Sequence, residues 1–279
     1  MAVVLITGCS SGFGLLAALH FARKGDTVYA TMRDTAKAGA LEAARDKESL
    51  PIHVVPLDVT DDASVANAVR QVVAEAGRID VLVNNAGIGI HGPIEDTDVA
   101  EVKEIFETNV FGAMRAVNAV APTMRQQGSG TIVNVSSLAG RVVAPFGGIY
   151  SASKYAVEAL SEALHYELHP FGIRVVVIEP GGFETRFGDN RRVSSRFTEG
   201  SAYLDLERRF EASLERLPGR GGPGDPQVVA EAIYNAVQDK EPKLRYLVGQ
   251  DAEMIGGLRK QMDDTQFEQT MRQALDFWD

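Results

Sequence analysis

The chain has 279 residues, and 28 lysines and arginines against 38 aspartates and glutamates give it a formal charge of −10 at pH 7. Apolar residues make up 45% of the chain and charged residues 24%, a composition that argues against disordered, collagen-like and coiled-coil proteins. The acidic balance disfavours nucleic acid or an anionic membrane as the main partner. A chain of this length buries enough surface to form a core without disulfides or metal ions.

Cysteine content and the N-terminal segment bear on location. The single cysteine, Cys9, excludes an intramolecular disulfide and a thiolate zinc cluster and fits a reducing compartment, so we expect a cytoplasmic protein. Residues 1–22 contain no lysine, arginine, aspartate or glutamate. They nevertheless lack the cationic start of a signal peptide, and the turn residues 7–12 would interrupt a membrane span. We expect a buried strand, a turn and a buried helix there, and no membrane span.

Short apolar runs alternate with helical patterns along most of the chain. Seven runs are continuous rather than alternating, which indicates strands buried on both faces of a parallel sheet. They are Val3–Thr7, Thr27–Thr31, Ile52–Leu57, Ile79–Val83, Gly130–Val135, Ile173–Glu179 and Leu244–Val248. Helices are predicted at 12–24, 61–76, 98–126, 150–170 and 226–238. The sequence thus predicts an α/β fold, a single-domain, doubly wound (Rossmann-type) sheet of about seven parallel strands with helices on both faces.

Two segments fall outside this alternation. Residues 186–224 contain apolar residues at three- and four-residue steps from Tyr203 to Leu217, which predicts an amphipathic helix within a substrate lid. Residues 251–279 contain a further apolar series that ends at Trp278. We assign residues 1–250 to a dinucleotide-binding catalytic domain that includes the lid, and residues 251–279 to a helical extension packed on it. For both segments, plain surface packing and a role in a substrate pocket or interface remain alternatives.

The first predicted strand leads into a turn with glycines at positions 8, 12 and 14. Glycine lets the backbone turn tightly and approach a pyrophosphate, whose charge then lies at a helix N-terminus. The motif predicts a nucleotide site built from Gly8, Ser10, Ser11, Gly12, Phe13 and Gly14. By itself the turn is also compatible with a flavin or a sugar nucleotide.

The end of the second predicted strand distinguishes the two nicotinamide cofactors. A carboxylate there would bind the ribose hydroxyls of NAD(H) and repel a 2′-phosphate. The sequence has Met32 and Arg33 instead, and an arginine can pair with a phosphate. Ser11 could add a hydroxyl donor. We therefore expect NADP(H) rather than NAD(H), with Asp34 as the ribose ligand in the alternative case.

Three further residues suggest acid–base chemistry. Tyr150 and Lys154 begin a predicted helix four residues apart, so their side chains lie on one face. A tyrosine is a poor acid or base at neutral pH unless a nearby cation stabilises its phenolate, and Lys154 can provide that charge. Ser137 follows a strand, at the edge where a doubly wound sheet binds its ligands. Taken singly, these could be a surface Tyr–Lys pair and an ordinary strand end.

Taken together, the motifs resemble the short-chain dehydrogenase/reductase family. Thr7–Gly14, Asn84–Gly87, Ser137, Tyr150 with Lys154, and Pro180–Gly181 occur in the family's order and at its spacings. The resemblance covers about residues 3–185. Residues 27–34 and the glycine turn are most similar to the 17β-hydroxysteroid and retinol dehydrogenase branch, which favours NADP(H).

The resemblance implies a Ser-Tyr-Lys mechanism. Tyr150 would exchange a proton with the substrate oxygen, Lys154 would lower the pKa of Tyr150 and bind the nicotinamide ribose, and Ser137 would orient the substrate oxygen. Asn109 matches the family's fourth catalytic position and would hold a water molecule. Further implied cofactor contacts are Asp58 and Val59 at the adenine, Asn85, Ala86 and Gly87 along the cofactor wall, Pro180 and Gly181, and Thr185 at the carboxamide.

The expected function is NADP(H)-dependent interconversion of a ketone and a secondary alcohol, or of an aldehyde and a primary alcohol. The alternative is a nucleotide-sensing regulatory protein that keeps the fold without the chemistry. An apolar substrate is suggested by Phe146, Phe183, Phe187, Phe197, Tyr203 and Leu204. The chemistry requires no metal ion, and the helical pair His165 and His169 is expected on a solvated face. The long helices of this family pair across a two-fold axis, so we expect a homodimer or homotetramer.

Overall fold

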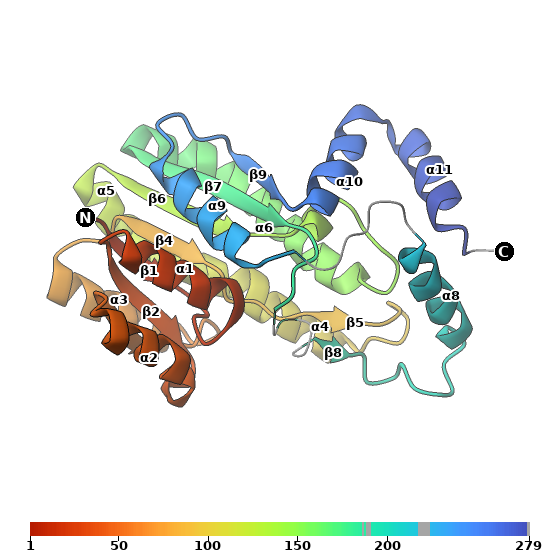
Figure 1. Ribbon diagram of the computed structural model, residues 1–279, viewed down its shortest axis with the longest axis horizontal. Helices are drawn as coiled ribbons and strands as arrows, with labels where there is room; N and C mark the ends of the chain where they lie inside the picture. The colour runs from red at the N-terminus through yellow and green to blue at the C-terminus, as the bar shows by residue number, and fades with distance from the viewer. Residues whose placement is uncertain (186, 188–190, 217–223, 278–279) are drawn as a thin grey trace.

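The computed structural model describes residues 1–185, 187, 191–216 and 224–277. Its centre is a seven-stranded parallel sheet with strand order β3-β2-β1-β4-β6-β7-β9 (Figure 1). The strands are β1 (Val3–Ile6), β2 (Thr27–Met32), β3 (Ile52–Pro56), β4 (Val81–Asn84), β6 (Gly130–Val135), β7 (Ile173–Pro180) and β9 (Arg245–Val248). All seven predicted strands are confirmed, and their ends lie within two residues of the predicted ones. The strand order reverses between β1 and β4, the place where doubly wound sheets bind ligands.

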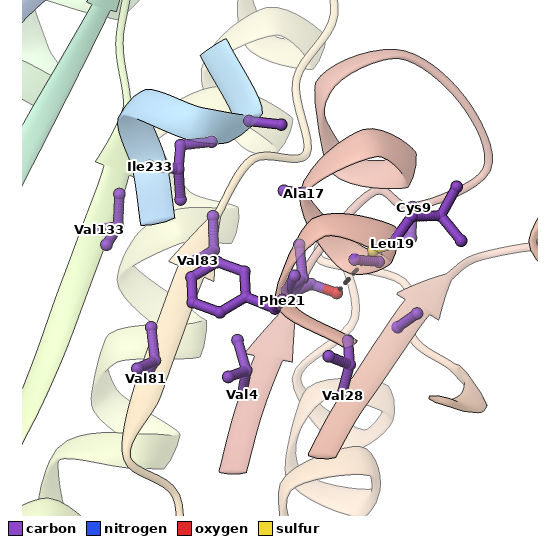
Figure 2. Packing of buried hydrophobic residues seen from close by; sticks show 14 of the residues in the cluster. Val4, Cys9, Ala17, Leu19, Phe21, Val28, Val81, Val83, Val133 and Ile233 are labelled. Carbon is purple, nitrogen blue, oxygen red and sulfur yellow. Dashed lines mark hydrogen bonds between the residues drawn. The ribbon is translucent and has the colours of Figure 1, made fainter. Parts of the chain in front are cut away.

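Helices cover both faces of the sheet (Figure 1). One face carries α1 (Gly12–Arg23), α2 (Gly39–Glu48) and α9 (Gln227–Gln238), and the other α3 (Asp62–Ala76), α5 (Gly112–Gln127) and α6 (Gly148–Leu168). Because successive strand residues point to opposite faces, Val4 belongs to the first core and Leu5 to the second. Figure 2 shows the first core, where Phe21 of α1 packs on Val83. Cys9 is buried in this core, and burial raises the pKa of its thiol to about 12.

The predicted helix at 98–126 is divided in two. Residues Val99–Phe106 form α4, and a π-helical turn at Glu107–Phe111 joins it to α5. Single π turns within helices are frequent at functional sites, and this one contains Asn109. Helix α2 was not predicted because its sequence lacks an apolar stripe and buries only Leu41. A second sheet pairs β5 (Ile90–His91) with β8 (Arg192–Val193), and strands this short leave no sequence pattern.

The lid and tail contribute helices at one end of the molecule, on the right in Figure 1. They are α8 (Leu204–Glu215), α10 (Gln250–Gln261) and α11 (Asp264–Leu275). An apolar cluster joins Phe146 to Phe210 of α8 and to Leu275 and Phe277 of the tail. The amphipathic lid helix is therefore present, and the tail consists of two helices. Leu217 and Trp278, the ends of the two predicted series, lie outside the described residues.

None of the helices in the described part of the chain is long and apolar enough to cross a membrane.

Candidate active site

The glycine turn between β1 and α1 is held against the loop that follows β4. Thr7 Oγ1 accepts hydrogen bonds from the backbone N–H groups of Asn85 and Ala86, both at 3.0 Å. The Asn85 side-chain amide donates to the Thr7 carbonyl at 2.9 Å and to the Gly8 carbonyl at 3.1 Å. A Cβ at Gly14 would collide with the Gly8 carbonyl oxygen and lie 2.5 Å from Asn85 Nδ2. Only glycine at position 14 allows the turn and this loop to pack so closely.

The N-terminus of α1 fits a phosphate group. Ser11, which precedes the helix, makes no side-chain cap, and the first turn contains no acidic residue. Gly12 has a φ of +58°, and a Cβ there would lie 3.6 Å from the Thr185 side chain. Ser10, Ser11 and Phe13 are partly exposed around this opening. Uncapped N–H groups and the helix dipole favour an anion, so these residues fit the pyrophosphate of a dinucleotide.

The end of β2 separates the two candidate ribose ligands. The Met32 side chain belongs to the first core and is 3% exposed, whereas Arg33 is exposed. The Asp34 carboxylate accepts a hydrogen bond from the backbone N–H of Ala36 at 3.1 Å and caps the next turn. The arginine is thus accessible at the strand end, while the aspartate is engaged by its own backbone.

The expected adenine contacts follow β3. Asp58 Oδ1 accepts hydrogen bonds from the backbone N–H of Thr60 at 2.9 Å and from the Thr60 hydroxyl at 2.8 Å. The backbone N–H of Asp58 donates to Ser64 Oγ at 2.9 Å. Val59 is buried, and a Cβ at Gly112 of α5 would lie 2.9 Å from its side chain. These contacts fix the loop at the same edge of the sheet as the glycine turn.

Tyr150 and Lys154 lie in the first turns of α6, and Lys154 Nζ is 5.7 Å from the centroid of the Tyr150 ring. Ser137, at the end of β6, hydrogen-bonds to the Tyr150 phenol. The Ser137 hydroxyl also lies 3.4 Å from the Pro180 carbonyl oxygen. Desolvation raises the pKa of Tyr150 to about 12, and the hydrogen bond with Ser137 opposes this shift.

Lys154 is buried, and its ammonium donates to the Val135 carbonyl at 2.9 Å. Burial lowers the pKa of Lys154 to about 8, and the negative charge of Glu158 partly offsets the effect of burial. At neutral pH the site therefore holds a protonated phenol next to an ammonium. This arrangement is suited to donating a proton to a substrate oxygen and to stabilising the phenolate that remains.

Asn109 and Gly87 lie beside Lys154. In the π turn, Asn109 Oδ1 accepts from the backbone N–H of Ile88 at 2.9 Å, and its amide donates to the Ile88 carbonyl at 3.0 Å and to Ser153 Oγ at 3.0 Å. A Cβ at Gly87 would lie 3.3 Å from Asn109 Oδ1 and 3.8 Å from Lys154 Nζ. The three residues that the sequence pattern selected separately thus surround one small space. Gly181 follows β7 and lines the same cavity as Ser137 and Tyr150, and its N–H donates to the Val248 carbonyl at 2.9 Å.

A cavity of about 720 Å³ extends from Ser137 and Tyr150 towards the lid and tail helices. Its apolar lining includes Ile94, Val142, Val143, Phe146, Phe210, Leu214, Ile255, Phe267, Met271 and Leu275. Four of these residues belong to the tail, for which the sequence left a pocket role and plain surface packing as alternatives. The apolar series in residues 251–279 was the available signal, but surface packing explained it equally well.

Most of the six side chains that suggested an apolar substrate do not line this cavity. Of the six residues chosen, Phe146 lines the cavity, whereas Phe183, Phe187, Phe197, Tyr203 and Leu204 do not. Phe183 instead packs edge-to-face on Phe13 with ring centroids 5.7 Å apart, and it contacts the first core. Phe187 lies close to the site, with its ring centroid 5.5 Å from that of Tyr150.

A group of histidine and carboxylate side chains away from the crevice is close enough together to hold a metal ion. In the described part of the chain, His91, Glu207 and Glu211 offer ligand atoms within 4.8 Å of one another. The His91 ring nitrogen already bonds to Glu207 at 3.0 Å, a contact that joins β5 to α8. Of the helical histidine pair, His169 is exposed and His165 is half-buried.

Comparison with known proteins identifies relatives over most of the chain. The family model described as short chain dehydrogenase matches residues 2–195. A 3-ketodihydrosphingosine reductase of Bacteroides thetaiotaomicron is 40% identical, with 88% of this chain and 87% of that protein covered. The human 17-beta-hydroxysteroid dehydrogenase type 1 is 38% identical, with 94% and 81% covered.

Solved structures are similar over the whole fold. A short-chain dehydrogenase from Streptomyces avermitilis has a TM-score of 0.80 and 37% identity, and 97% of each chain is covered. The structure of ElxO with NADP bound has a TM-score of 0.74 at 26% identity, with 88% and 96% covered. A short chain dehydrogenase/reductase from Burkholderia phymatum in complex with NAD has a TM-score of 0.78 at 25% identity, with 93% and 92% covered. Structural neighbours therefore bind either nicotinamide cofactor.

Proposed function

The chain belongs to the short-chain dehydrogenase family of oxidoreductases, and from that premise we propose that it interconverts an apolar ketone and its secondary alcohol with NADP(H). An aldehyde and its primary alcohol are the second form of the same reaction. The observation that carries the proposal is the meeting of Ser137, Tyr150 and Lys154 at one end of an apolar cavity, beside the glycine turn.

The residues around the crevice fit a bound dinucleotide. We assign the pyrophosphate to the N-terminus of α1, with Gly8, Ser10, Ser11, Gly12, Phe13 and Gly14 around it. The adenine half is assigned to Asp58 and Val59, and the nicotinamide half to Asn85, Ala86, Gly87, Pro180, Gly181 and Thr185, with Tyr150 and Lys154 at the ribose. When bound, the nicotinamide supplies or accepts the hydride, and the protein positions and polarises the substrate.

Side chains of this protein would transfer the proton that accompanies the hydride. In reduction, Tyr150 gives its phenolic proton to the substrate oxygen, and the nearby Lys154 ammonium stabilises the phenolate. Ser137 donates a hydrogen bond to the substrate oxygen and fixes its position. Asn109 is held by Ile88 and Ser153 next to Lys154, a location from which it can hold a water that links Lys154 to solvent. Lys154 would pass a proton to the Tyr150 phenolate, and this water would replace the proton that Lys154 gave up. Oxidation uses the same steps in reverse.

The end of β2 supports NADP(H) as the preferred cofactor. Arg33 is exposed where a 2′-phosphate would lie, and an arginine–phosphate pair is a strong, charge-assisted interaction. Asp34 is the residue that would favour NAD(H), but its carboxylate caps the following turn. The size and apolar lining of the cavity support a lipophilic substrate with an extended body.

A cofactor-oxidation assay tests this function. The protein is mixed with NADPH or NADH and with long-chain, polycyclic and short-chain ketones, and loss of the reduced nicotinamide is followed by absorbance. We expect turnover with NADPH and a lipophilic ketone, and a rate at least about 10²-fold lower in the Tyr150→Phe variant. Saturable NADPH binding without turnover of any ketone or alcohol would favour the nucleotide-sensing alternative.

A further inference from the structure

A second cavity, of about 470 Å³, lies between α6, β7, β9 and α10. Its lining is dominated by charged side chains: Glu158 and Glu162 of α6, Glu179 of β7, Arg245 of β9, Arg259 and Lys260 of α10, and Arg141. It shares Arg141, Tyr155 and Arg259 with the substrate cavity. The roles assigned above use none of these carboxylates.

Glu179 is fully buried, yet neither of its carboxylate oxygens has a hydrogen-bond partner among the described residues. The nearest cations are Arg245 Nε and Arg141 Nε, at 3.7 and 3.8 Å from Oε1. An ionised carboxylate that is buried without hydrogen bonds is costly. Burial, followed by the charge of Glu158, raises the pKa of Glu179 above its ordinary value, to about 7.

Glu158 lies against the same guanidinium. Its Oε2 accepts from Arg245 Nε at 2.8 Å, and its Oε1 is buried and has no partner among the described residues. One nitrogen atom is therefore within 3.7 Å of both carboxylates. Two carboxylates that share one site do not both ionise readily. One proton between Glu158 and Glu179 reduces the repulsion and supplies a donor for their unpartnered oxygens.

This pair adjoins the candidate active site. Glu158 follows Lys154 by four residues, so the two side chains are neighbours on α6. A Cβ at Gly140 would lie 3.0 Å from Glu158 Cγ and 3.3 Å from the Lys154 carbonyl carbon, so backbone packs over this part of the helix. The charge of Glu158 acts on the buried Lys154 ammonium and raises its pKa.

We propose that Glu158 and Glu179 share one proton and are positioning residues that act through Lys154. Their negative charge keeps Lys154 protonated as the pH rises. The inference rests on the proposed function, in which Lys154 is the cation beside Tyr150. When the pair loses its shared proton to solvent in the second cavity, its charge changes from −1 to −2. The added negative charge then stabilises the ammonium of Lys154, whose pKa of about 8 lies above the pKa of about 7 of Glu179.

Carboxylate, phenol, guanidinium and ammonium side chains also line this cavity around the pair. On α6, Glu162 pairs with Arg245, which lowers the pKa of Glu162, and desolvation raises the pKa of Tyr155. Arg141, Arg245 and Arg259 are guanidinium groups that stay protonated. Lys260 of α10 is exposed at the rim. The shared proton is therefore the feature of this cavity that changes with pH around neutrality.

A direct test follows the carboxyl and lysine signals by ¹³C NMR in protein labelled at glutamate and lysine. In the wild type, one glutamate carboxyl should titrate near pH 7, and that signal should be absent from Glu179→Gln. The Lys154 signal, assigned by its loss in Lys154→Met, should titrate about 0.5–1 pH unit lower in Glu179→Gln, because the added charge is removed. Glu158→Gln should lower it as well, which provides a second variant if Glu179→Gln does not fold.

The matched control is Glu162→Gln. It removes an ion pair to the same Arg245, at 2.6 Å, but from a side chain that is 46% exposed. We expect the Lys154 titration to move by less than about 0.2 pH unit, because solvent screens an exposed charge. An equal shift in Glu162→Gln and Glu179→Gln would overturn the proposal, since it would then reflect the loss of any charge near Arg245.

Alcohol oxidation provides the functional readout. The kcat/KM for alcohol oxidation should fall at high pH, where Lys154 loses its charge. In Glu179→Gln this fall should occur roughly 0.5–1 pH unit lower than in the wild type. At lower pH the rate should stay within about twofold of wild type, because the pair is protonated there. If no glutamate carboxyl of the wild type titrates near pH 7, the proposed shared proton is overturned, whether or not the enzyme is active. Absence of turnover with the titration intact counts instead against the proposed function.

Discussion

The ammonium of Lys154 lies 5.7 Å from the ring centroid of Tyr150, and desolvation acts on the two groups in opposite directions. It raises the pKa of Tyr150 to about 12 and lowers the pKa of Lys154 to about 8. Each group is thereby pushed towards its neutral form. The site is set for proton donation by the phenol, and the charge of Lys154 is the feature most sensitive to its surroundings.

Tyr150→Phe tests the proton donor. The change removes one oxygen and keeps the ring, so we expect folding and cofactor binding to persist while kcat falls by at least about 10²-fold. The measurements are ketone reduction with chemistry rate-limiting, NADPH binding by fluorescence, and a thermal melt. A variant that retains more than about a tenth of the wild-type rate would contradict the role assigned to Tyr150.

Lys154→Met tests the cost of keeping a charge in the site. The pKa of Lys154 is about 8 in the folded protein against an ordinary value of 10.5, so burying the charged form makes folding less favourable below about pH 8. As pH rises from about 8 to 10.5 this penalty disappears, on the order of 3 kcal/mol. The variant also loses the hydrogen bond to the Val135 carbonyl, which lowers its free energy of unfolding by about 1–3 kcal/mol at any pH.

The expected outcome compares the two proteins at two pH values. At pH 7 the free energy of unfolding of the inactive variant should lie within about 2 kcal/mol of the wild-type value. At pH 10 the variant should be clearly less stable than the wild type. Urea titrations at both pH values measure this difference, and groups common to both proteins cancel. A stability difference that does not change with pH would mean that Lys154 is not destabilised by its burial.

The tail helix α11 is expected to bind substrate. Met271 lines the substrate cavity, and Met271→Ala should raise KM for a lipophilic ketone by about three- to tenfold, because apolar contact is lost. The kcat value should stay within about twofold, since the residue is remote from Tyr150 in sequence and role. Met254→Ala on α10 is the control, because Met254 is 45% exposed and does not line the cavity. Equal KM values in the wild type, Met271→Ala and Met254→Ala would show that the tail does not contact the substrate.

The sheet and the glycine turn were predictable because their signals are local. A continuous apolar run such as residues 175–178 fits a strand covered on both faces. The β1–α1 turn needs glycine at positions 8 and 14, because other backbone atoms lie too close there for a side chain. Tyr150 and Lys154 were predictable as neighbours for the same reason, since helix geometry relates residues four apart. Their catalytic roles stay predictions.

The features that were missed depend on contacts between distant segments. The tail forms part of the cavity because Leu275 packs with Phe146, and nothing in residues 251–279 alone specifies that partner. Glu158 and Glu179 are adjacent to one arginine only because α6, β7 and β9 are neighbours in the fold. Phe183 was misassigned because an aromatic residue after a strand can serve either a pocket or a core, and here it packs on Phe13.

Exposed apolar side chains on α5 and α6 support the expected self-association. Phe111, the last residue of the π turn before α5, and Met114 of α5 are 46% and 38% exposed, and Tyr166 of α6 is 67% exposed. Light scattering should give two or four times the chain mass of 30.1 kDa. Tyr166→Asp should weaken the assembly, while Val228→Asp on α9, at the opposite face of the sheet, should not. A particle of one chain mass at micromolar concentration would contradict the expectation.

Arg33 is expected to set the choice of cofactor. If its guanidinium pairs with a 2′-phosphate, that contact contributes about 1.5–3 kcal/mol to NADPH binding and nothing to NADH binding. Arg33→Ala should then raise KM for NADPH by roughly 10- to 100-fold and leave KM for NADH almost unchanged. Arg33→Asp should go further and reverse the preference, because it adds a carboxylate that repels the phosphate. The carboxylate is placed at position 33 rather than 32, because Met32 lies in the first core and a charge there would be buried.

The measurement is kcat/KM for both cofactors in the wild type, the two Arg33 variants and two controls. Lys47→Ala makes the same change of charge on the exposed surface of α2 and should leave the preference unaltered. Asp34→Ala should also leave it unaltered, because the Asp34 carboxylate caps the turn through Ala36 rather than facing a ribose. Equal losses for NADPH and NADH in Arg33→Ala would mean that the arginine contacts only groups that both cofactors share. A wild type that prefers NADH, together with a loss of that preference in Asp34→Ala, would instead make Asp34 the ribose ligand.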